Sequence, residues 1–187
     1  MLSDGEIREA LDSGELEISG WTPLYIGPSS VDLHLDNHAK VLPAGTQFNG
    51  KLHAEKKDEI AGLFTDMNGW DEITIYPNEF YVLSTVEKIK LSSSMAGYLQ
   101  GRSSIARIGL NIHAAGFADP GFEGNLTLEV VNFTNYPIVL KKHTRIGQMT
   151  FQRTGRPCEV PYGAKKDSKY QGQVGPTLTK VHEDYDN

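Results

Sequence analysis

The sequence predicts one mainly β domain, a sandwich or barrel of short strands preceded by a single short helix. Short runs of alternating apolar and polar residues, separated by Gly, Pro and Asn, fill most of the chain, whereas helix-start signals stand at its beginning. The 187 residues suit one domain spanning 1–187, and 39% hydrophobic with 22% charged residues is enough for a packed core.

The N-terminal segment carries the helix signals. Ser3-Asp4-Gly5-Glu6 is a capping-box pattern, with Ser at the N-cap and Glu three residues later. The apolar residues that follow fall on one helical face: Ile7, Ala10 and Leu11. Gly14 ends the pattern, so we expect a short helix from Ser3 to Ser13.

The rest of the chain reads as strands. The predicted strand segments are Val31–Leu35, Ile73–Tyr76, Phe80–Leu83, Leu126–Val130, Ile138–Leu140 and Ile146–Phe151. The segment from Lys51 to Asp71 is a polar insertion, predicted to be partly helical around Asp58 to Phe64. The segment 155–187 is rich in Gly, Pro, Lys and Ser and is either a frayed terminus or a lid that closes over an anionic, aromatic ligand.

Composition excludes several classes of function. A net charge of −6 argues against broad nucleic-acid binding, and no apolar run approaches the length of a membrane span. The N-terminus lacks a signal-peptide pattern, so we expect a cytoplasmic protein. Cys158 is the single cysteine and cannot form an internal disulfide or supply paired thiolates to zinc. We expect the histidines, whose spacing gives no ligand motif, to be surface or hydrogen-bonded core residues rather than metal ligands: His34, His113 and His143.

The stretch Gly101 to Leu110, GRSSIARIGL, is a candidate phosphate-binding segment. Arg102 offers a guanidinium, while Ser103 and Ser104 offer hydroxyls and backbone N–H groups, the donors that converge on phosphate. Arg107 adds a second guanidinium, and a helical turn here would also direct free N–H groups at an anion. On the local pattern alone, a solvated turn is the more common interpretation.

Two carboxylates are candidates for chemistry. Asp119 lies in a turn-rich loop, and Glu129 lies inside the strand that follows. By alternation Glu129 points away from the face of Leu128 and Val130, so it is either exposed or placed in a pocket. In a pocket, desolvation would raise its pKa towards neutrality and suit it to proton transfer.

The ordered motifs together resemble the dCTP deaminase family of the dUTPase superfamily, in its monofunctional or bifunctional dCTP deaminase/dUTPase form. The segments that carry the resemblance are Gly27–Leu35, Gly101–Leu110, Ala115–Glu129, Arg145–Gln148 and Ser168–Gln173. The resemblance extends from Leu2 to about Thr179. It implies a homotrimer of dUTPase-like distorted β-barrel or jelly-roll subunits, with active sites between neighbours and 155–187 as the lid.

The resemblance also implies roles for single residues. Arg102, Ser103 and Ser104 would bind phosphates. Asp119 would receive the sugar 3′-hydroxyl, and Glu129 would be the general acid/base of deamination. The attacking water and the amino group would be held by Ser103, Arg107 and the backbone of Ala115. The residues expected to complete the substrate site are Thr127, Gln148, Tyr162, Lys169, Tyr170 and Gln173.

The implied chemistry is zinc-independent. Most nucleobase deaminases activate water on zinc held by His and Cys, which a single cysteine does not allow. Glu129 would therefore activate the water, Mg²⁺ would arrive on the triphosphate, and dTTP is the expected inhibitor.

The number of reactions is open at this level. Ala115-Gly116-Phe117 and Gln148 favour the bifunctional form, which makes dUMP and diphosphate from dCTP. The stretch from His113 to Asp119 is one residue shorter than is usual in the deaminases, so the water-holding position is Ala114 or Ala115. A deaminase that stops at dUTP, a dUTPase alone and a non-catalytic nucleotide-binding scaffold are the alternatives; Glu129 argues against the dUTPase alone.

Overall fold

A computed structural model describes residues 1–20, 22–46, 50–113 and 115–185 of the protein. Its N-terminal helix, α1 (Asp4–Asp12), has the predicted capping box. The Ser3 hydroxyl accepts from the backbone N–H of Glu6 at 3.4 Å, and the Glu6 carboxylate accepts from the backbone N–H of Ser3 at 2.8 Å. The buried face of α1 carries Ile7 and Ala10, so the predicted helix is confirmed.

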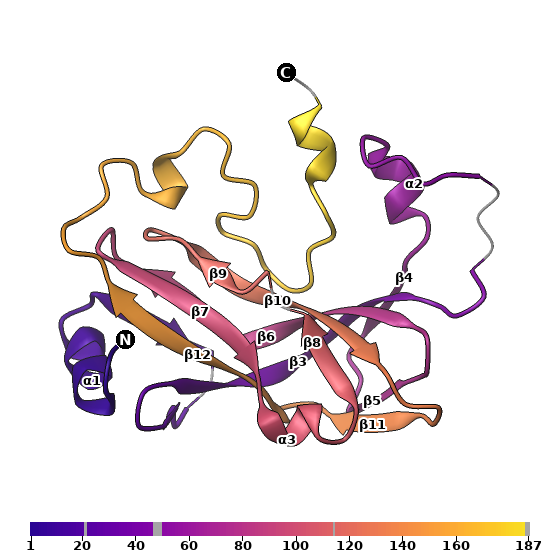
Figure 1. Ribbon diagram of the computed structural model, residues 1–187, viewed down its shortest axis with the longest axis horizontal. Helices are drawn as coiled ribbons and strands as arrows, with labels where there is room; N and C mark the ends of the chain where they lie inside the picture. Colours follow the sequence, from indigo (N-terminus) through magenta and orange to yellow (C-terminus); the bar gives the residue numbers. More distant parts are fainter. Residues whose placement is uncertain (21, 47–49, 114, 186–187) are drawn as a thin grey trace.

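Strands make up most of the remaining structure (Figure 1). In chain order they are β1 (Leu16–Ser19), β2 (Tyr25–Ile26), β3 (Val31–Leu42), β4 (Thr65–Asn68), β5 (Glu72–Ile75), β6 (Phe80–Leu91), β7 (Met95–Gly101), β8 (Leu110–His113), β9 (Phe117–Ala118), β10 (Glu123–Asn132), β11 (Ile138–Lys141) and β12 (Arg145–Arg153). The short helices are α2 (Lys57–Ala61) and α3 (Ser103–Ala106), and the 3₁₀ turns are η1 (Tyr162–Ala164) and η2 (Val181–Asp184).

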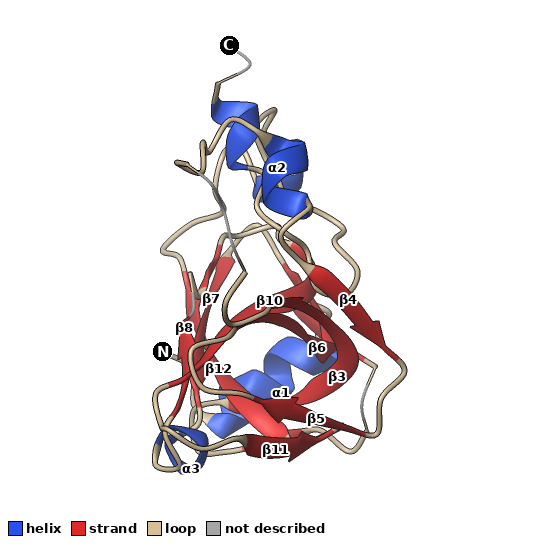
Figure 2. Cartoon of the chain, turned by 90° about the vertical axis from the view of Figure 1, so that its right-hand side faces the viewer, coloured by secondary structure: helices blue, strands red, loops and turns tan. Residues whose placement is uncertain are grey.

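The main sheet has the strand order β8-β10-β6-β3-β12-β7-β9, with β1, β2 and β4 added at its sides. Its strand pairings are antiparallel, and β5 and β11 form a separate antiparallel pair. The strands curl around the core, as Figure 2 shows. This architecture confirms the predicted mainly β fold with a barrel-like curvature.

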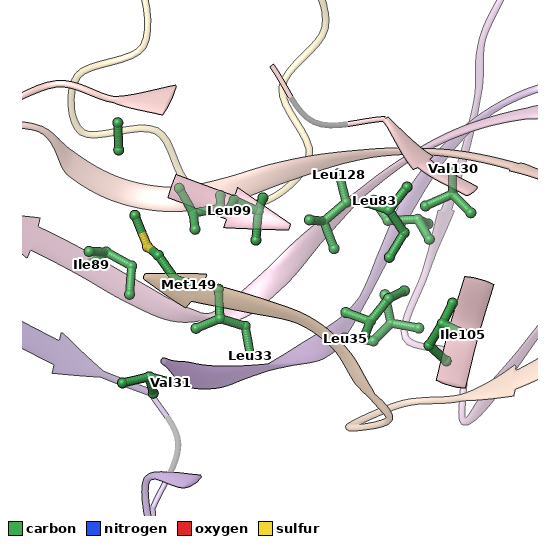
Figure 3. Close-up of a cluster of buried hydrophobic side chains, with 14 of the residues drawn as sticks. Val31, Leu33, Leu35, Leu83, Ile89, Leu99, Ile105, Leu128, Val130 and Met149 are labelled. Atoms are coloured by element: carbon green, nitrogen blue, oxygen red, sulfur yellow. The ribbon is translucent and has the colours of Figure 1, made fainter. Parts of the chain in front are cut away.

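The core lies inside the curled sheet (Figure 3). Leu33 and Leu35 of β3 meet Leu83 of β6 and Leu128 of β10 there, and all four side chains are fully buried. Burial of one such leucine stabilises the fold by about 1.5–3 kcal/mol. Along β10 buried and half-buried residues alternate strictly, so one face of this strand is committed to the core and the other is left for a site.

The insertion between residues 51 and 71 is more ordered than its sequence indicates. The helix α2 falls in the predicted helical part, but β4, which pairs with β3, was not predicted. The four residues of β4 are all exposed, so no alternation of apolar and polar side chains marks this strand. No helix of the described segments is long and apolar enough to cross a bilayer.

Candidate active site

A cavity of about 370 Å³ lies on the outer face of β10, under the C-terminal tail. Many of the predicted site residues line it: Ala115, Asp119, Thr127, Glu129, Tyr162, Tyr170 and Gln173. The tail and α2 stand together on this side of the sheet in both views (Figures 1 and 2). The frayed-terminus interpretation does not describe residues 155–185, because backbone N–H groups of Cys158, Tyr162 and Gly172 donate to the carbonyls of Ser93, Pro120 and Glu123.

Glu129 reaches the cavity because of the alternation along β10. Thr127 and Glu129 are half-buried and face outwards, whereas Leu128 and Val130 are buried in the core. The Cα partners of Glu129 are His113 on β8 and Val82 on β6, so Glu129 has a paired strand on each side and does not lie on an edge strand. A carboxylate in a partly apolar cavity can exchange protons with a ligand there.

Asp119 is held by the turn between β9 and β10. The backbone N–H of Phe122 donates to the Asp119 carbonyl at 3.0 Å, which closes the turn. Gly121 has φ +89°, and a Cβ at this position would lie 2.6 Å from Cβ of Pro161. Glycine is thus required both by the backbone conformation and by the close approach of the tail. The tail is fastened here by the Tyr162 N–H, which donates to the Pro120 carbonyl at 2.8 Å.

Beyond this point the tail runs along β10. The Asn125 N–H donates to the Gln173 carbonyl at 3.0 Å, and Nε2 of Gln173 donates to the Asn125 carbonyl at 2.6 Å. Further on, the Thr177 N–H donates to Oγ1 of Thr127 at 3.4 Å. Oε1 of Gln173 is buried without a hydrogen-bond partner among the described residues. Gln173 lines the cavity, so a ligand N–H there is a candidate partner for this oxygen.

Lys169 is predicted to close on the ligand, but it is not among the residues that line the cavity. Its Nζ lies 2.5 Å from Oδ1 of Asp184, and this hydrogen bond raises the pKa of Lys169 above its ordinary value. The neighbouring Tyr170 lines the cavity, and its hydroxyl accepts from the Lys180 N–H at 3.1 Å. A phosphate that uses Lys169 must therefore either share its ammonium with Asp184 or replace Asp184 as its partner.

The predicted phosphate-binding segment lies elsewhere in the chain. Ser103 and Ser104 begin α3 and are exposed, as is Arg107 after it. Figure 1 shows α3 at the edge of the molecule opposite the tail. Within one chain the structure therefore does not bring these three residues, or Arg102, to the cavity that holds Glu129.

Arg102 and Gln148 share a neighbourhood with Asp32. The Asp32 carboxylate pairs with Arg102 and, at 3.1 Å, with Arg145. Gln148 is the Cα partner of Asp32 across β12 and β3, so their side chains share a face. This ion-paired cluster fixes the guanidinium of Arg102 beside the start of α3.

The sequence analysis missed the apolar half of the cavity. Ile60 and Phe64 come from the insertion, and Phe80 and Val82 come from β6. The rings of Phe64 and Phe80 meet edge to face with centroids 6.3 Å apart. A partial signal was present, because Ile60 and Phe64 are large apolar residues in a segment that is otherwise rich in charged residues. Other lining residues that were not predicted are Leu99, Phe122, Leu126, Thr177, Leu178 and Thr179.

His34 is buried and hydrogen-bonded to Glu87. Its side chain is 3% exposed, and Nδ1 lies 2.6 Å from Oε1 of Glu87, which is fully buried. The second oxygen of Glu87 accepts from the His34 backbone N–H at 2.9 Å. His34 is thus a hydrogen-bonded core histidine, as predicted. The alternative water-holding residue, Ala114, lies outside the described residues, whereas Ala115 lines the cavity.

Comparison with known proteins identifies the family. Residues 1–154 match the dCTP deaminase-like protein family. The chain belongs to this family. A curated relative from Corynebacterium efficiens, named dCTP deaminase, dUMP-forming, is 42% identical over 184 residues, covering 96% of this chain and 93% of the relative. A relative of the same name from Mycobacterium sp. (strain KMS) is 41% identical over 187 residues, covering 99% and 97%.

Solved structures agree with this membership at the level of the fold. The 2′-deoxycytidine 5′-triphosphate deaminase from Agrobacterium tumefaciens superposes with a TM-score of 0.61 at 24% identity, covering 82% of this dCTP deaminase-like chain. This chain spans 48% of the Agrobacterium chain. The EIAV dUTPase superposes with a TM-score of 0.50 at 18% identity, covering 82% of this chain and 98% of the dUTPase. The predicted dUTPase-like fold class is confirmed.

Proposed function

We propose that the protein hydrolyses the 4-amino group of dCTP without zinc and then converts the resulting dUTP to dUMP and diphosphate. The observation that carries this proposal is the placement of Glu129 in a cavity together with Asp119, Thr127 and Gln173. The names of its relatives support both steps, because these enzymes are described as dUMP-forming dCTP deaminases.

In the first reaction Glu129 is the general base and then the general acid. It takes a proton from water as the water oxygen bonds to C4, and it delivers that proton to N3. It next moves the proton of the new C4 hydroxyl to the amino group, so that the C4–N bond breaks, the C4=O bond forms and ammonia leaves. A single positioned acid/base contributes about 10²–10⁴-fold, and positioning must supply the rest. Ser103, Arg107 and the backbone of Ala115 hold the water and the amino group.

The separation of the phosphate-binding segment Gly101–Leu110 from the cavity argues for an active site that two subunits share. Arg102, Ser103 and Ser104 would bind the triphosphate, but α3 stands at the opposite edge of the same chain. A homotrimer with sites between neighbours would place α3 of one subunit beside the Glu129 cavity of the next. Gln148 would join the phosphate side, and Tyr162, Lys169, Tyr170 and Gln173 would close from the tail.

In the second reaction Asp119 directs a water to the α-phosphorus of dUTP. The new P–O bond forms as the bond to the β-phosphate oxygen breaks, which releases diphosphate and leaves dUMP. Mg²⁺ would arrive bound to the triphosphate, keep most of its own waters and neutralise phosphate charge. Arg102 and the two serines that follow it would hold the phosphates that carry the ion. dTTP, which shares sugar and triphosphate, is the proposed inhibitor.

One assay tests the proposal. The purified protein is incubated separately with dCTP and dUTP in Mg²⁺, and the products are resolved by chromatography with ammonia measured in parallel. We expect ammonia and dUMP from dCTP, and dUMP from dUTP. If dCTP yields ammonia and dUTP but no dUMP, the protein is a deaminase that lacks the second reaction, and that half of the proposal fails. Turnover of dUTP without any ammonia from dCTP would contradict the deaminase.

A further inference from the structure

The part of the tail that enters the cavity is a loop closed at its base. Tyr170, Gln173 and the segment 177–179 line the cavity, and all of them lie between Lys169 and Lys180. Residues 169–180 thus form a surface loop that covers one side of the cavity. A compact surface loop of this length depends on contacts that join its two ends.

Lys180 makes those contacts. Its Nζ donates to the Lys169 carbonyl at 2.5 Å, and its backbone N–H donates to the Tyr170 hydroxyl at 3.1 Å. Its ammonium also lies 5.9 Å from the centre of the Tyr170 ring, within the range of a cation–π contact. One residue therefore ties down both the backbone of Lys169 and the ring and hydroxyl of Tyr170.

A second ion pair closes the same base. Asp184 of η2 lies 2.5 Å from Nζ of Lys169, so the segment after Lys180 is also folded back on the start of the loop. Within the loop, Gln173 is fixed to β10 through the backbone of Asn125. The loop is consequently held at its base by Lys180 and by the Tyr162 hydroxyl, which accepts from the Tyr170 N–H at 3.1 Å, and farther along by β10.

We infer that Lys180 is a positioning residue that holds the 169–180 loop in its closed geometry, so that Tyr170 and Gln173 are presented to the nucleotide as a preformed unit. This inference rests on the proposed function for the identity of the nucleotide. Without the ties of Lys180 the loop samples open conformations, and the apparent affinity falls by the fraction of protein that remains closed. Because Lys180 does not touch the reacting atoms, the effect falls on KM rather than on kcat.

The test compares three single variants with the wild-type protein. Lys180→Met keeps the length of the aliphatic stem and removes the ammonium, whereas Lys180→Arg keeps the charge and the donors. Lys166→Met is the matched control, because Lys166 is an exposed lysine of the same tail and the change in charge is identical. Steady-state kinetics with dCTP and hydrogen–deuterium exchange of residues 170–179 in ligand-free protein are measured for each.

For Lys180→Met we expect KM for dCTP to rise about 3- to 10-fold, the size of one typical lost hydrogen bond, with kcat within about twofold. Amide exchange in 170–179 should accelerate by a similar factor. Lys180→Arg should restore both quantities, and Lys166→Met should change neither.

Unchanged exchange and unchanged KM in Lys180→Met would overturn the inference, as would equal effects in Lys166→Met. A fall in kcat with KM unchanged would also overturn it. The proposed function fails separately, if the wild-type protein releases no ammonia from dCTP. In that case the exchange of residues 170–179 still decides whether Lys180 holds the loop.

Discussion

A site shared between subunits makes a quantitative prediction for mixed trimers. In the proposed trimer, Glu129→Gln would remove the proposed acid/base and Ser103→Ala would remove a proposed phosphate donor, so each variant alone is expected to be nearly inactive. Because the cavity and α3 lie at opposite edges of one chain, each site would combine the cavity of one subunit with α3 of its neighbour. Mixed trimers can therefore regain intact sites.

The expected recovery follows from random assembly. In an equal mixture half of the subunits carry an intact cavity, and half carry an intact phosphate motif. A site needs an intact cavity on one subunit and an intact motif on the next, so about a quarter of all sites are restored in a cyclic trimer. Ammonia release from dCTP should reach about one quarter of the wild-type value, after all samples are unfolded and refolded together.

The control uses two residues of the same cavity. Glu129 and Asp119 line it within one chain, so a mixture of Glu129→Gln and Asp119→Asn subunits leaves every cavity damaged. The specific activity of this mixture should stay at the mean of the two parent variants. Mass spectrometry shows whether mixed trimers have formed. If they have, and the activity of the Glu129→Gln and Ser103→Ala mixture still equals the mean of its two parents, the reasoning is refuted.

Three further outcomes are expected. Glu129→Gln should lower ammonia release from dCTP about 10²–10⁴-fold while calorimetry still detects nucleotide binding, and retained ammonia release would remove Glu129 from its role. A chain that ends at Gly163 lacks the loop that lines the cavity, so turnover should fall severely while the number of subunits in the assembly, measured by native mass spectrometry, stays the same. Full activity would contradict the role of the tail. Glu87→Ala leaves the buried His34 without its carboxylate and should reduce the free energy of unfolding by about 3–5 kcal/mol, measured in urea at fixed protein concentration; a loss below about 1 kcal/mol would count against it.

The elements that the sequence predicts well are those with a local cause. The capping box of Ser3 and Glu6 is formed by residues three apart, and it marks α1 correctly. The alternation from Leu126 to Val130 assigns Glu129 to the face opposite the core, as the structure has it. In both cases the geometry repeats along the chain itself, so neighbouring residues carry the information.

The elements that were missed have distant causes. The exposed strand β4 is ordered by pairing with β3, and nothing in its own four residues announces that partner. The apolar wall of Ile60 and Phe64 becomes part of the cavity because α2 folds beside the tail. Lys169 carries the right charge for a phosphate but is engaged by Asp184, a contact between two segments of the tail.

The sequence by itself determined the class of fold, the face on which Glu129 of β10 lies and the chemical groups that a nucleotide site needs. Only the tertiary structure decided which of these groups share a cavity. It joined Glu129 to Asp119 and the tail, and it set the GRSS segment at the other edge of the chain. The physical reason is that alternation fixes a side chain to one face of a strand, whereas the curl of the sheet and the path of the tail decide what covers that face.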